Sequence, residues 1–478
     1  MQQALIDSLR GSFQGRLLHA EDDVKPFLSD FRKRWTGTTL AVVQPDSTED
    51  VAAVVRWCVK NNVTIYPQGG NTGLVGGNIP DSAHTPNIVL SLQRMNRILE
   101  VNPYNNTLTA QAGAVLQHVQ EAAAREQRLF PLSLGAEGSC TLGGNLATNA
   151  GGIQVLRYGN ARDLCLGLEV VTADGEIWNG LRGLRKDNTG YDLKHLFVGS
   201  EGTLGIITAA TVKLYPQPAA QMTAFAALPD AQSAVRLLAL AQQQLSASLT
   251  AFELICGASV QLVLKHAPQM RNPVATDAPY YVLLESSDAE GEAHAAERFE
   301  HLMSTAFEDG IILDAAIASS LSQSATFWQI RHHLPEAQAA DGENIKHDIS
   351  LPISSIPEFI ERGAAAVQSK LPGGRIFVFG HLGDGNLHYN VSAPAGSDAA
   401  AYQAMRDNEK TISRAVYDVV TQMNGSISAE HGVGQLRVSS IAHYKSPLEI
   451  AMMKRIKQAL DPDNRLNPGR VIAPPHSL

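Results

Sequence analysis

The chain has 478 residues, of which 44% are hydrophobic and 18% are charged. This length exceeds what one hydrophobic core usually supports, so we expect a soluble globular protein of two or three domains. The formal net charge of −9 argues against nucleic acid as a partner, because phosphate binding requires a basic surface. We expect no transmembrane segment, because no run of about eighteen apolar residues occurs.

The cysteines indicate a reducing compartment. Cys58, Cys140, Cys165 and Cys256 are widely spaced and form no Cys-x-x-Cys motif. Asp7 interrupts the apolar stretch that a signal peptide would need. We therefore expect a cytoplasmic protein, or one of an organelle matrix if a targeting segment has been removed.

The N-terminal part of the chain predicts helices and one β/α unit. Residues 1–36 are charged and are expected to be helical, with no assigned chemistry. In the unit that follows, Ser47 and Asp50 form a capping-box pattern ahead of a helix over 51–60. The next strand, 63–66, runs directly into a glycine-rich segment.

Two glycine-rich loops follow. The first, 67–77, has five glycines within nine residues, so its backbone N–H groups can turn toward one point and bind phosphate oxygens. A flexible surface loop would explain the same composition. Glycines and small hydroxyl residues return at 133–152, after expected strands at 87–92 and 107–112 and a helix at 115–125. Neither loop is a Walker A motif or a Gly-x-Gly-x-x-Gly fingerprint, and the pair fits a large diphosphate cofactor better than a mononucleotide.

A domain boundary is expected after a third glycine-containing segment. Residues 199–208 lead into an expected strand at 211–215, which ends at Pro216-Gln217-Pro218. Two prolines so close together cannot continue a central strand, so we place the boundary there.

The second part of the chain alternates helices with strands. A helix beginning near Ser322 carries Arg331, and the strand 345–351 places Lys346 on the face opposite its apolar residues. Taken alone, both cations read as solvated charges. Further elements are expected as helices at 231–245, 295–306, 399–423 and 447–460 and as strands at 280–285 and 311–317.

The segment 380–390 predicts a metal-binding hairpin. If Asp384-Gly385 is its two-residue turn, His381 lies directly opposite His388, with Cβ atoms roughly 5 Å apart. Glu430 and His431 follow another short β-type run, 426–429, and precede a glycine-rich bend.

Two histidines and one carboxylate form a metal set with an open position. His381, His388 and Glu430 suit zinc best, and other divalent metals also accept such ligands. The alternative is that the histidines lie on a hairpin surface and that Glu430 is a solvated charge.

Several motifs together resemble one family. They are Gly69-Gly70-Asn71-Thr72, Gly143-Gly144 with Gly151-Gly152, Gly199-Ser200-Glu201-Gly202-Thr203-Leu204-Gly205, the His381 to His388 segment, Glu430-His431-Gly432 and Asn467-Pro468-Gly469-Arg470. In this order, over about nine tenths of the chain, the set resembles the FAD-linked D-2-hydroxy-acid dehydrogenases. Within that family it most resembles the enzymes that oxidise D-2-hydroxyglutarate. The next greatest resemblance is to those that oxidise D-lactate.

The resemblance implies an α+β fold of the vanillyl-alcohol-oxidase type. It implies an FAD-binding domain at 1–218 with two subdomains, an α+β substrate and metal domain at 219–440, and a helical tail at 441–478 that returns to the FAD domain. The cofactor-binding residues it implies are Pro67, Gly69, Gly70, Asn71, Thr72, Gly73, Leu74, Ser133, Gly135, Gly138, Ser139, Thr141, Gly143, Gly144, Asn149, Gly151, Gly152, Glu201, Gly202, Gly205, Ile206 and Asn467.

The resemblance also predicts non-covalent FAD. Asn71 stands where relatives with histidyl-linked flavin carry His, and it offers no nucleophile. Cys140 lies where some bicovalent relatives place a cysteinyl link, but with Asn71 present we expect dissociable FAD.

The substrate residues implied are Arg331, Lys346, Asn390 and His431. Two cations suit a dicarboxylate, whereas lactate needs only one. Pro335 stands near a position where the D-2-hydroxyglutarate enzymes carry a polar residue. The identity of the D-2-hydroxy acid substrate therefore stays open.

The implied reaction is the metal-assisted oxidation of a D-2-hydroxy acid to the 2-oxo acid. The metal coordinates the α-hydroxyl and lowers its pKa, His431 accepts the proton, and C2 gives a hydride to flavin N5. We expect an electron acceptor such as a quinone or an electron-transfer flavoprotein, and a homodimer is compatible with the sequence. A metal-dependent hydrolase is the alternative from another class, and a binding-only flavoprotein is a third.

Overall fold

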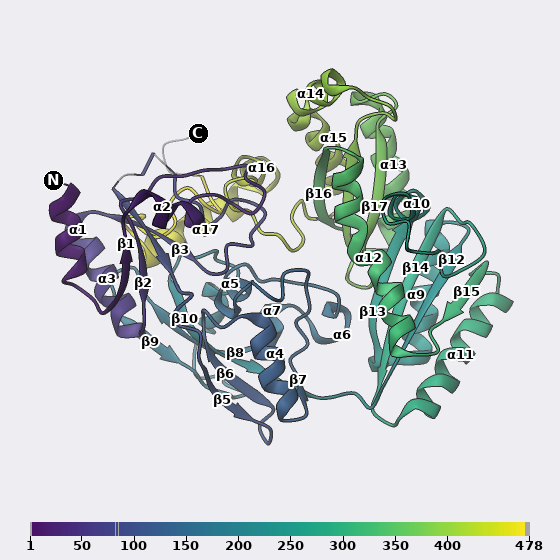
Figure 1. Cartoon of the computed structure of the whole chain (residues 1–478), viewed down its shortest axis with the longest axis horizontal. Coiled ribbons are helices and arrows are strands. Elements are labelled where there is room, and N and C mark those ends of the chain that lie inside the picture. The colour runs from purple at the N-terminus through teal and green to yellow at the C-terminus, as the bar shows by residue number, and fades with distance from the viewer. Residues whose placement is uncertain (1, 82, 85, 474–478) are drawn as a thin grey trace. The chain divides into compact units, whose positions relative to one another are not determined.

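The computed structural model describes residues 2–81, 83–84 and 86–473. The chain divides into two compact units, of which unit 1 is mainly purple, blue and yellow in Figure 1 and unit 2 is teal and green. Unit 1 comprises Met1–Gly151, Gly159–Gln217 and His431–Leu478, and unit 2 comprises Gly152–Tyr158 and Pro218–Glu430. Within the described part of the chain, every helix is too short or too polar to span a bilayer.

Unit 1 contains two main β-sheets. In the first, of order β1-β2-β4-β3, strands β2, β4 and β3 are parallel and β1 is antiparallel to β2. The second is antiparallel and has the order β5-β6-β10-β8-β9. The strands are β1 (Gly15–Leu18), β2 (Ala41–Pro45), β3 (Thr64–Gln68), β4 (Asn87–Ser91), β5 (Ile98–Asn102), β6 (Thr107–Gln111), β8 (Cys165–Val171), β9 (Ile177–Gly180) and β10 (Ile206–Lys213), with a separate short pair β7 (Arg128–Leu129) and β11 (Tyr215–Pro216).

Helix α3 (Thr48–Asn61) of unit 1 has capping signals at both ends. Ser47 accepts a hydrogen bond from the backbone N–H of Asp50 at the start of α3, and Asn62 ends this helix in the left-handed conformation. The helices are α1 (Gln2–Arg10), α2 (Glu21–Val24), α3 (Thr48–Asn61), α4 (Leu116–Arg125), α5 (Leu142–Ala147), α7 (Ala161–Leu164), α8 (Lys194–Phe197), α16 (Val438–Tyr444) and α17 (Pro447–Leu460).

The first 36 residues are not helical throughout, so that expectation is wrong. After α1 the chain forms the edge strand β1, which pairs with β2. The strand buries Leu18 against Val42 and Val89, and this burial favours the sheet over a continued helix.

Unit 2 is built on one seven-stranded antiparallel sheet of order β15-β12-β14-β13-β17-β18-β16. Its strands are β12 (Ala220–Leu228), β13 (Leu249–Cys256), β14 (Tyr280–Asp288), β15 (Asp314–Ile317), β16 (Asn344–Ser350), β17 (Arg375–His381) and β18 (Asn386–Ser392). Its helices are α6 (Val155–Tyr158), α9 (Ala231–Leu245), α10 (Gly257–His266), α11 (Glu292–Glu308), α12 (Leu321–Asp341), α13 (Ile356–Lys370), α14 (Ala399–Asp407) and α15 (Glu409–Gln422).

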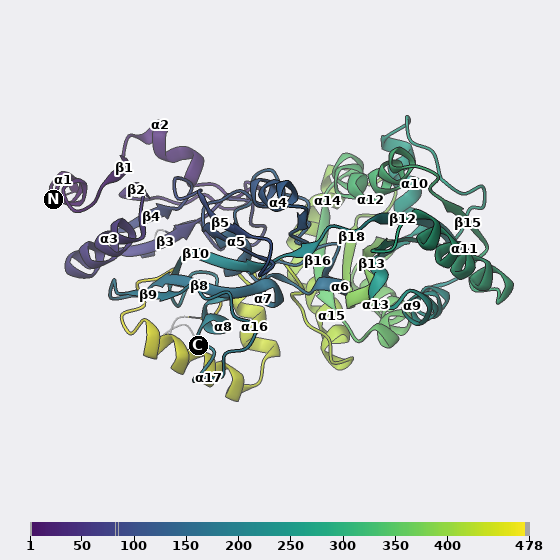
Figure 2. The ribbon, with the colours of Figure 1, turned by 90° about the horizontal axis from the view of Figure 1, so that it is seen from below.

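Helices cover both faces of this sheet (Figure 2). Helices α10 and α12 share one hydrophobic cluster with Phe225 and Phe379 of the sheet. On the opposite face, Phe359 of α13 packs on Tyr389 with ring centroids 5.2 Å apart. Because successive strand residues face opposite sides, the neighbours of Tyr389, namely His388 and Asn390, lie on the α12 face.

Two expectations about unit 2 are wrong. The helix expected over 399–423 is two helices, because Asn408 leaves helical geometry (φ −97°, ψ 5°) and serves as the C-cap of α14 and the N-cap residue of α15. Asn often breaks helices in this way, because its side chain competes for backbone hydrogen bonds. The strand expected at 426–429 is a single bridge between Ser426 and Ser350.

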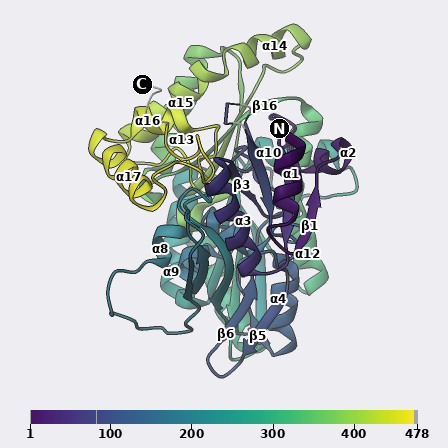
Figure 3. The same cartoon turned by 90° about the vertical axis from the view of Figure 1, so that its left-hand side faces the viewer.

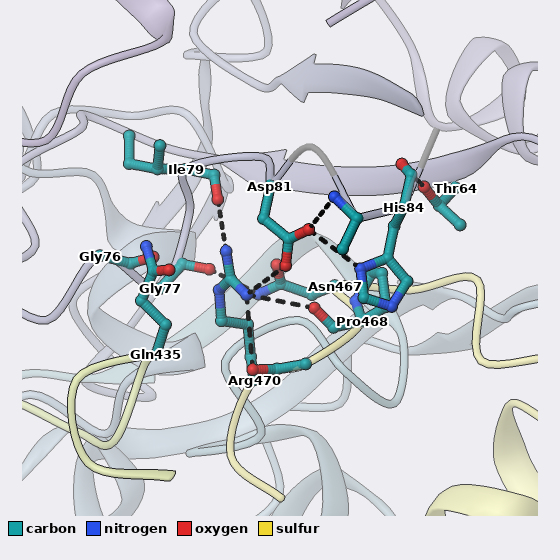
Figure 4. Close-up of polar contacts among 12 residues, drawn as sticks. Thr64, Gly76, Gly77, Ile79, Asp81, His84, Gln435, Asn467, Pro468 and Arg470 are labelled. Atoms are coloured by element: carbon teal, nitrogen blue, oxygen red, sulfur yellow. Dashed lines mark hydrogen bonds and ion pairs between the residues drawn. The ribbon is translucent and has the colours of Figure 1, made fainter. Parts of the chain in front are cut away.

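The C-terminal segment, yellow in Figure 3, returns to β3 of unit 1. Leu466 pairs in parallel with Ile65, whose carbonyl accepts a 2.8 Å hydrogen bond from the Asn467 N–H. Figure 4 shows the buried Arg470 guanidinium, which donates to the Ile79 carbonyl at 2.5 Å and lies 3.6 Å from the Asp81 carboxylate. The tail is thereby fixed to the loop after β3.

Lys457 anchors the same tail from α17, and its removal should destabilise the protein. Its ammonium donates to the Thr203 and Leu466 carbonyls at 2.7 and 2.9 Å and pairs with Asp461 at 2.5 Å. Lys457→Met would leave Asp461 buried without its charge partner, so we expect a loss of about 3 kcal/mol in the free energy of unfolding, measured by chemical denaturation. Lys454→Met on the same helix is the matched control, and an equal effect of both variants would contradict this role.

Candidate active site

The two glycine-rich loops meet in unit 1 and line one recess. Its lining includes these predicted cofactor residues: Pro67, Gly69, Gly70, Asn71, Thr72, Gly73, Thr141, Gly143, Gly144, Glu201, Gly202, Gly205, Ile206 and Asn467. His431 also lines it.

Glycine is required where the loops touch. A Cβ atom on Gly69 would overlap the Thr141 hydroxyl, and one on Gly70 would overlap the Ser139 carbonyl. The backbone therefore forms a close-walled cradle that side chains would fill. Such a cradle fits the diphosphate and the flat ring system of a flavin dinucleotide.

Some predicted cofactor residues lie outside the lining, and other residues were missed. Those outside it are Leu74, Ser133, Gly135, Gly138, Ser139, Asn149, Gly151 and Gly152. Asn149, for example, accepts a 2.9 Å hydrogen bond from the Arg162 N–H, so its side chain supports the loop. The lining residues missed are Gln68, Val75, Gly77, Asn78, Leu92, Cys140, Asn145, Ala147, Thr148 and Ile207, most of which neighbour predicted ones.

Asn71 and Cys140 both have protein partners in the recess. The Asn71 amide donates to the Ser29 carbonyl at 3.0 Å and accepts from the Asn78 amide at 2.7 Å. Burial raises the pKa of the Cys140 thiol, although a hydrogen bond from Asn145 opposes this shift. A thiol whose ionisation is disfavoured is a poor nucleophile.

Glu201 anchors the loop that carries His431. Its buried carboxylate accepts hydrogen bonds from the N–H groups of Val433 and Gly434 at 2.7 and 2.8 Å. The Asn467 amide donates to the Glu201 carbonyl at 2.7 Å. Three segments far apart in the sequence therefore converge on one wall of the recess.

The three predicted metal ligands lie together in unit 2. One ligand atom from each of His381, His388 and Glu430 lies within 4.8 Å of the others. The Glu430 carboxylate lies 3.6 Å from Nε2 of His388 and 3.9 Å from Nε2 of His381. Ligand atoms about 2.0–2.2 Å from one ion are roughly 3–4 Å apart, so this donor set fits a divalent cation such as zinc.

The expected hairpin register is wrong by two residues. His388 pairs with Phe379, not with His381, because the turn is longer than two residues. A 3₁₀ turn at Leu382–Asp384 and Gly385 in the left-handed conformation form this turn. A shift of two residues preserves the face of each side chain, and the two imidazoles still lie 5.8 Å apart between ring centroids.

Glu253 of β13, which sequence reasoning missed, lies behind the cluster. This fully buried carboxylate contacts Nδ1 of His381 at 2.5 Å and Nε of Arg331 at 2.6 Å. Burial would raise the pKa of Glu253, but His381 and Arg331 outweigh it and lower the pKa to about 2. Burial lowers the pKa of His381, whereas Glu253 and Glu430 raise it to about 9.

A second carboxylate supports Glu430. Asp348 is 2% exposed and accepts a 3.1 Å hydrogen bond from the Glu430 N–H and a 2.9 Å bond from the Asn386 amide. The β16 strand thus fixes the backbone at the ligand position. No sequence motif marks this contact, because 82 residues separate Asp348 from Glu430.

The predicted substrate residues of unit 2 lie on the α12 face. Lys346 and Asn390 are directly opposed on β16 and β18, and the Asn390 amide donates to Gln338 of α12 at 2.7 Å. Arg331, also on α12, uses Nε for Glu253. Its terminal amino groups make no hydrogen bond with the described residues, so they are available to a carboxylate.

Solved structures share this fold. An alkyldihydroxyacetonephosphate synthase matches 97% of this chain and 84% of its own with a TM-score of 0.74 at 18% identity. A p-cresol methylhydroxylase matches 98% of this chain and 96% of its own with a TM-score of 0.74 at 15% identity. The fold is α+β and of the vanillyl-alcohol-oxidase type, which confirms the expected class.

Two family models and several relatives support an FAD site in this chain. Residues 39–180 match the model "FAD binding domain", and residues 217–471 match "FAD linked oxidases, C-terminal domain". These matches define an FAD-dependent oxidoreductase. The D-2-hydroxyglutarate dehydrogenase of Xanthomonas citri pv. viticola is 40% identical over 95% of this chain and 94% of its own. The mitochondrial D-2-hydroxyglutarate dehydrogenase of Arabidopsis thaliana is 38% identical over 94% of this chain and 78% of its own. The chain belongs to the family of FAD-linked D-2-hydroxy-acid dehydrogenases.

Proposed function

We propose that the protein oxidises D-2-hydroxyglutarate to 2-oxoglutarate. One observation carries this proposal: Glu430 belongs to the metal-ligand cluster, His431 lines the recess, and one peptide bond joins them. Their Cα atoms are therefore about 3.8 Å apart. A ligand of the proposed metal and a residue of the recess proposed for the flavin are thus neighbours in the chain.

The cluster is proposed to hold a divalent cation, with zinc favoured. His381, His388 and Glu430 supply three ligands and leave positions for the substrate hydroxyl and one carboxylate oxygen. A bound cation lowers the pKa of a coordinated hydroxyl, and a bound flavin accepts the hydride from C2.

The side chains divide the remaining work. His431 accepts the hydroxyl proton, a role suited to imidazole near neutral pH. Glu201 fixes the loop of His431 through two backbone hydrogen bonds, and Asp348 fixes the backbone of Glu430. One carboxylate, Glu201, thus fixes the loop of the proposed base, and another, Asp348, fixes the backbone of the metal ligand Glu430.

Arg331 and Lys346 favour a diacid. The Arg331 terminal amino groups can bind one carboxylate in bidentate fashion, and Lys346 adds a second cation on the same sheet face. A monocarboxylate such as D-lactate, the alternative substrate, would need only one cation.

Lys346→Met is therefore expected to raise KM for D-2-hydroxyglutarate by about 10- to 100-fold and KM for D-lactate by much less. This range corresponds to the loss of one charge-assisted hydrogen bond. Lys370→Met, which changes an exposed lysine at the end of α13, is the matched control. Equal increases for both acids would refute the diacid preference.

FAD is proposed to be non-covalent, because Asn71 is not a nucleophile and the Cys140 thiol is held neutral. Acid precipitation should release all flavin into the supernatant, where absorbance detects it. Flavin that remains with the precipitated chain would contradict this assignment.

An anaerobic spectrum tests the function as a whole. D-2-hydroxyglutarate should bleach the flavin band, whereas L-2-hydroxyglutarate should not, and D-lactate should bleach it more slowly. A flavin that no D-2-hydroxy acid reduces would refute the proposal.

A further inference from the structure

Glu253 contacts one residue of the proposed metal site and one residue of the proposed substrate site in unit 2. Its two carboxylate oxygens are divided between them: Oε1 contacts Nδ1 of His381 at 2.5 Å, and Oε2 accepts from Nε of Arg331 at 2.6 Å. His381 is a predicted metal ligand and Arg331 a predicted substrate cation. The carboxylate is 0% exposed, so it depends on these two partners for its charge.

The contact with His381 determines which ring nitrogen can bind a metal. An ionised carboxylate only accepts hydrogen bonds, so Nδ1 of His381 carries the proton that it donates to Glu253. Nε2, the other nitrogen, is then the atom left for a metal ion, which would displace any proton there, and it lies 3.9 Å from the Glu430 carboxylate. Outer carboxylates of this kind orient metal-binding histidines in general.

The contact with Arg331 fixes a planar guanidinium. Its central carbon lies 4.9 Å from the centroid of the Phe379 ring, and Phe379 packs on His388 with centroids 5.0 Å apart. Arg331 is thus held at its Nε edge by Glu253 and across its face by Phe379, which leaves the terminal amino groups for a ligand.

These contacts form a closed ring. Glu253 touches His381, whose imidazole lies 5.8 Å from that of His388, and Phe379 connects His388 back to Arg331. A displacement of Glu253 would therefore disturb the metal ligand pair and the arginine together.

We propose that Glu253 is a positioning residue shared by the metal site and the carboxylate site. It fixes Nε2 of His381 as the ligating atom and orients Arg331 toward one carboxylate of a diacid. The role toward Arg331 rests on the proposed diacid substrate, whereas the role toward His381 rests only on the proposed metal site.

Glu253→Gln tests the role with two separate readouts on the full flavoprotein. Zinc affinity, measured by competition with a fluorescent chelator in the absence of substrate, should fall by about 10- to 100-fold. KM for D-2-hydroxyglutarate should rise by at least about tenfold, and KM for D-lactate by less than threefold. Unchanged zinc affinity would overturn the proposal.

Glu285→Gln is the matched control. Glu285 is also a buried glutamate, lies on the adjacent strand β14, and accepts a 2.9 Å hydrogen bond from Trp328 of the same helix α12. Its carboxylate accepts hydrogen bonds from Trp328 and Thr250, and within the described residues none joins it to His381 or Arg331. Both readouts should therefore stay within twofold of the wild type. Equal losses in both variants would reduce Glu253 to a structural role.

A wild-type measurement covers the case in which the variant does not fold. NMR of zinc-loaded protein with ¹⁵N-labelled histidine should show a ligand histidine with protonated Nδ1 and zinc on Nε2, and zinc on Nδ1 of His381 would refute the assignment. Because this measurement and the zinc affinity need no turnover, they stand even if no hydroxy acid reduces the flavin.

Discussion

His388→Ala should lower turnover by at least about a thousandfold while FAD remains bound. The variant removes one of three ligands from a cluster in which His388 Nε2 lies 3.6 Å from Glu430. A bound cation contributes several kcal/mol to transition-state stabilisation, and about 4 kcal/mol corresponds to that factor. Activity, bound metal and bound FAD are measured on one preparation by steady-state turnover, metal analysis and the flavin absorption spectrum.

The control for this variant is His301→Ala, which removes an exposed imidazole from α11. It should retain full metal content and turnover. If His388→Ala also kept its metal and its activity, the cluster would have no catalytic role.

His431→Ala should lower turnover by about a hundredfold or more and leave both FAD and metal bound. His431 lines the recess and is not one of the three ligands, so the variant removes a base without emptying either site. The factor is that of a lost general base.

His118→Ala on α4 provides the comparison, because this imidazole is exposed and does not line the recess. Turnover of His431→Ala within a few fold of wild type would assign the proton to another group. Loss of flavin from the variant would instead indicate that His431 supports the cofactor site.

The sequence correctly predicted that His381 and His388 lie on the same face of the hairpin, but it did not predict the register of the two strands. The turn after His381 is longer than two residues, but a shift by two preserves the alternation of a strand. His381 and His388 therefore meet even though they are not directly opposed. A shift by one residue would have separated them.

Long-range partners could not be predicted. Glu253 lies 128 residues from His381 and 78 from Arg331, and Glu201 lies 232 residues from Val433. Glu253 is an ordinary glutamate in its local sequence, and although Glu201 lies in a recognised glycine motif, its contact with the loop of His431 arises only from the tertiary fold. The glycine loops were recognisable because their backbone geometry leaves a local signature in composition.

Capping signals predicted helix boundaries only in part, since α3 begins at Thr48 and not at the expected residue 51 although Ser47 caps it. Ser446 and Glu449 form a reciprocal capping box at the start of α17, which has the expected bounds. Asn408 gave a weaker signal, and the expected single helix proved to be two. The β1 strand was missed because it gains its stability from burying Leu18 against other strands.

The half-reaction of the metal-free flavoprotein tests the central claim most directly. The protein is stripped of metal with a chelator, mixed anaerobically with D-2-hydroxyglutarate in a stopped-flow instrument, and measured again after one equivalent of zinc is restored. We predict slow flavin bleaching without metal and an increase of about a thousandfold with zinc. Bleaching at the same rate in both forms would contradict the account.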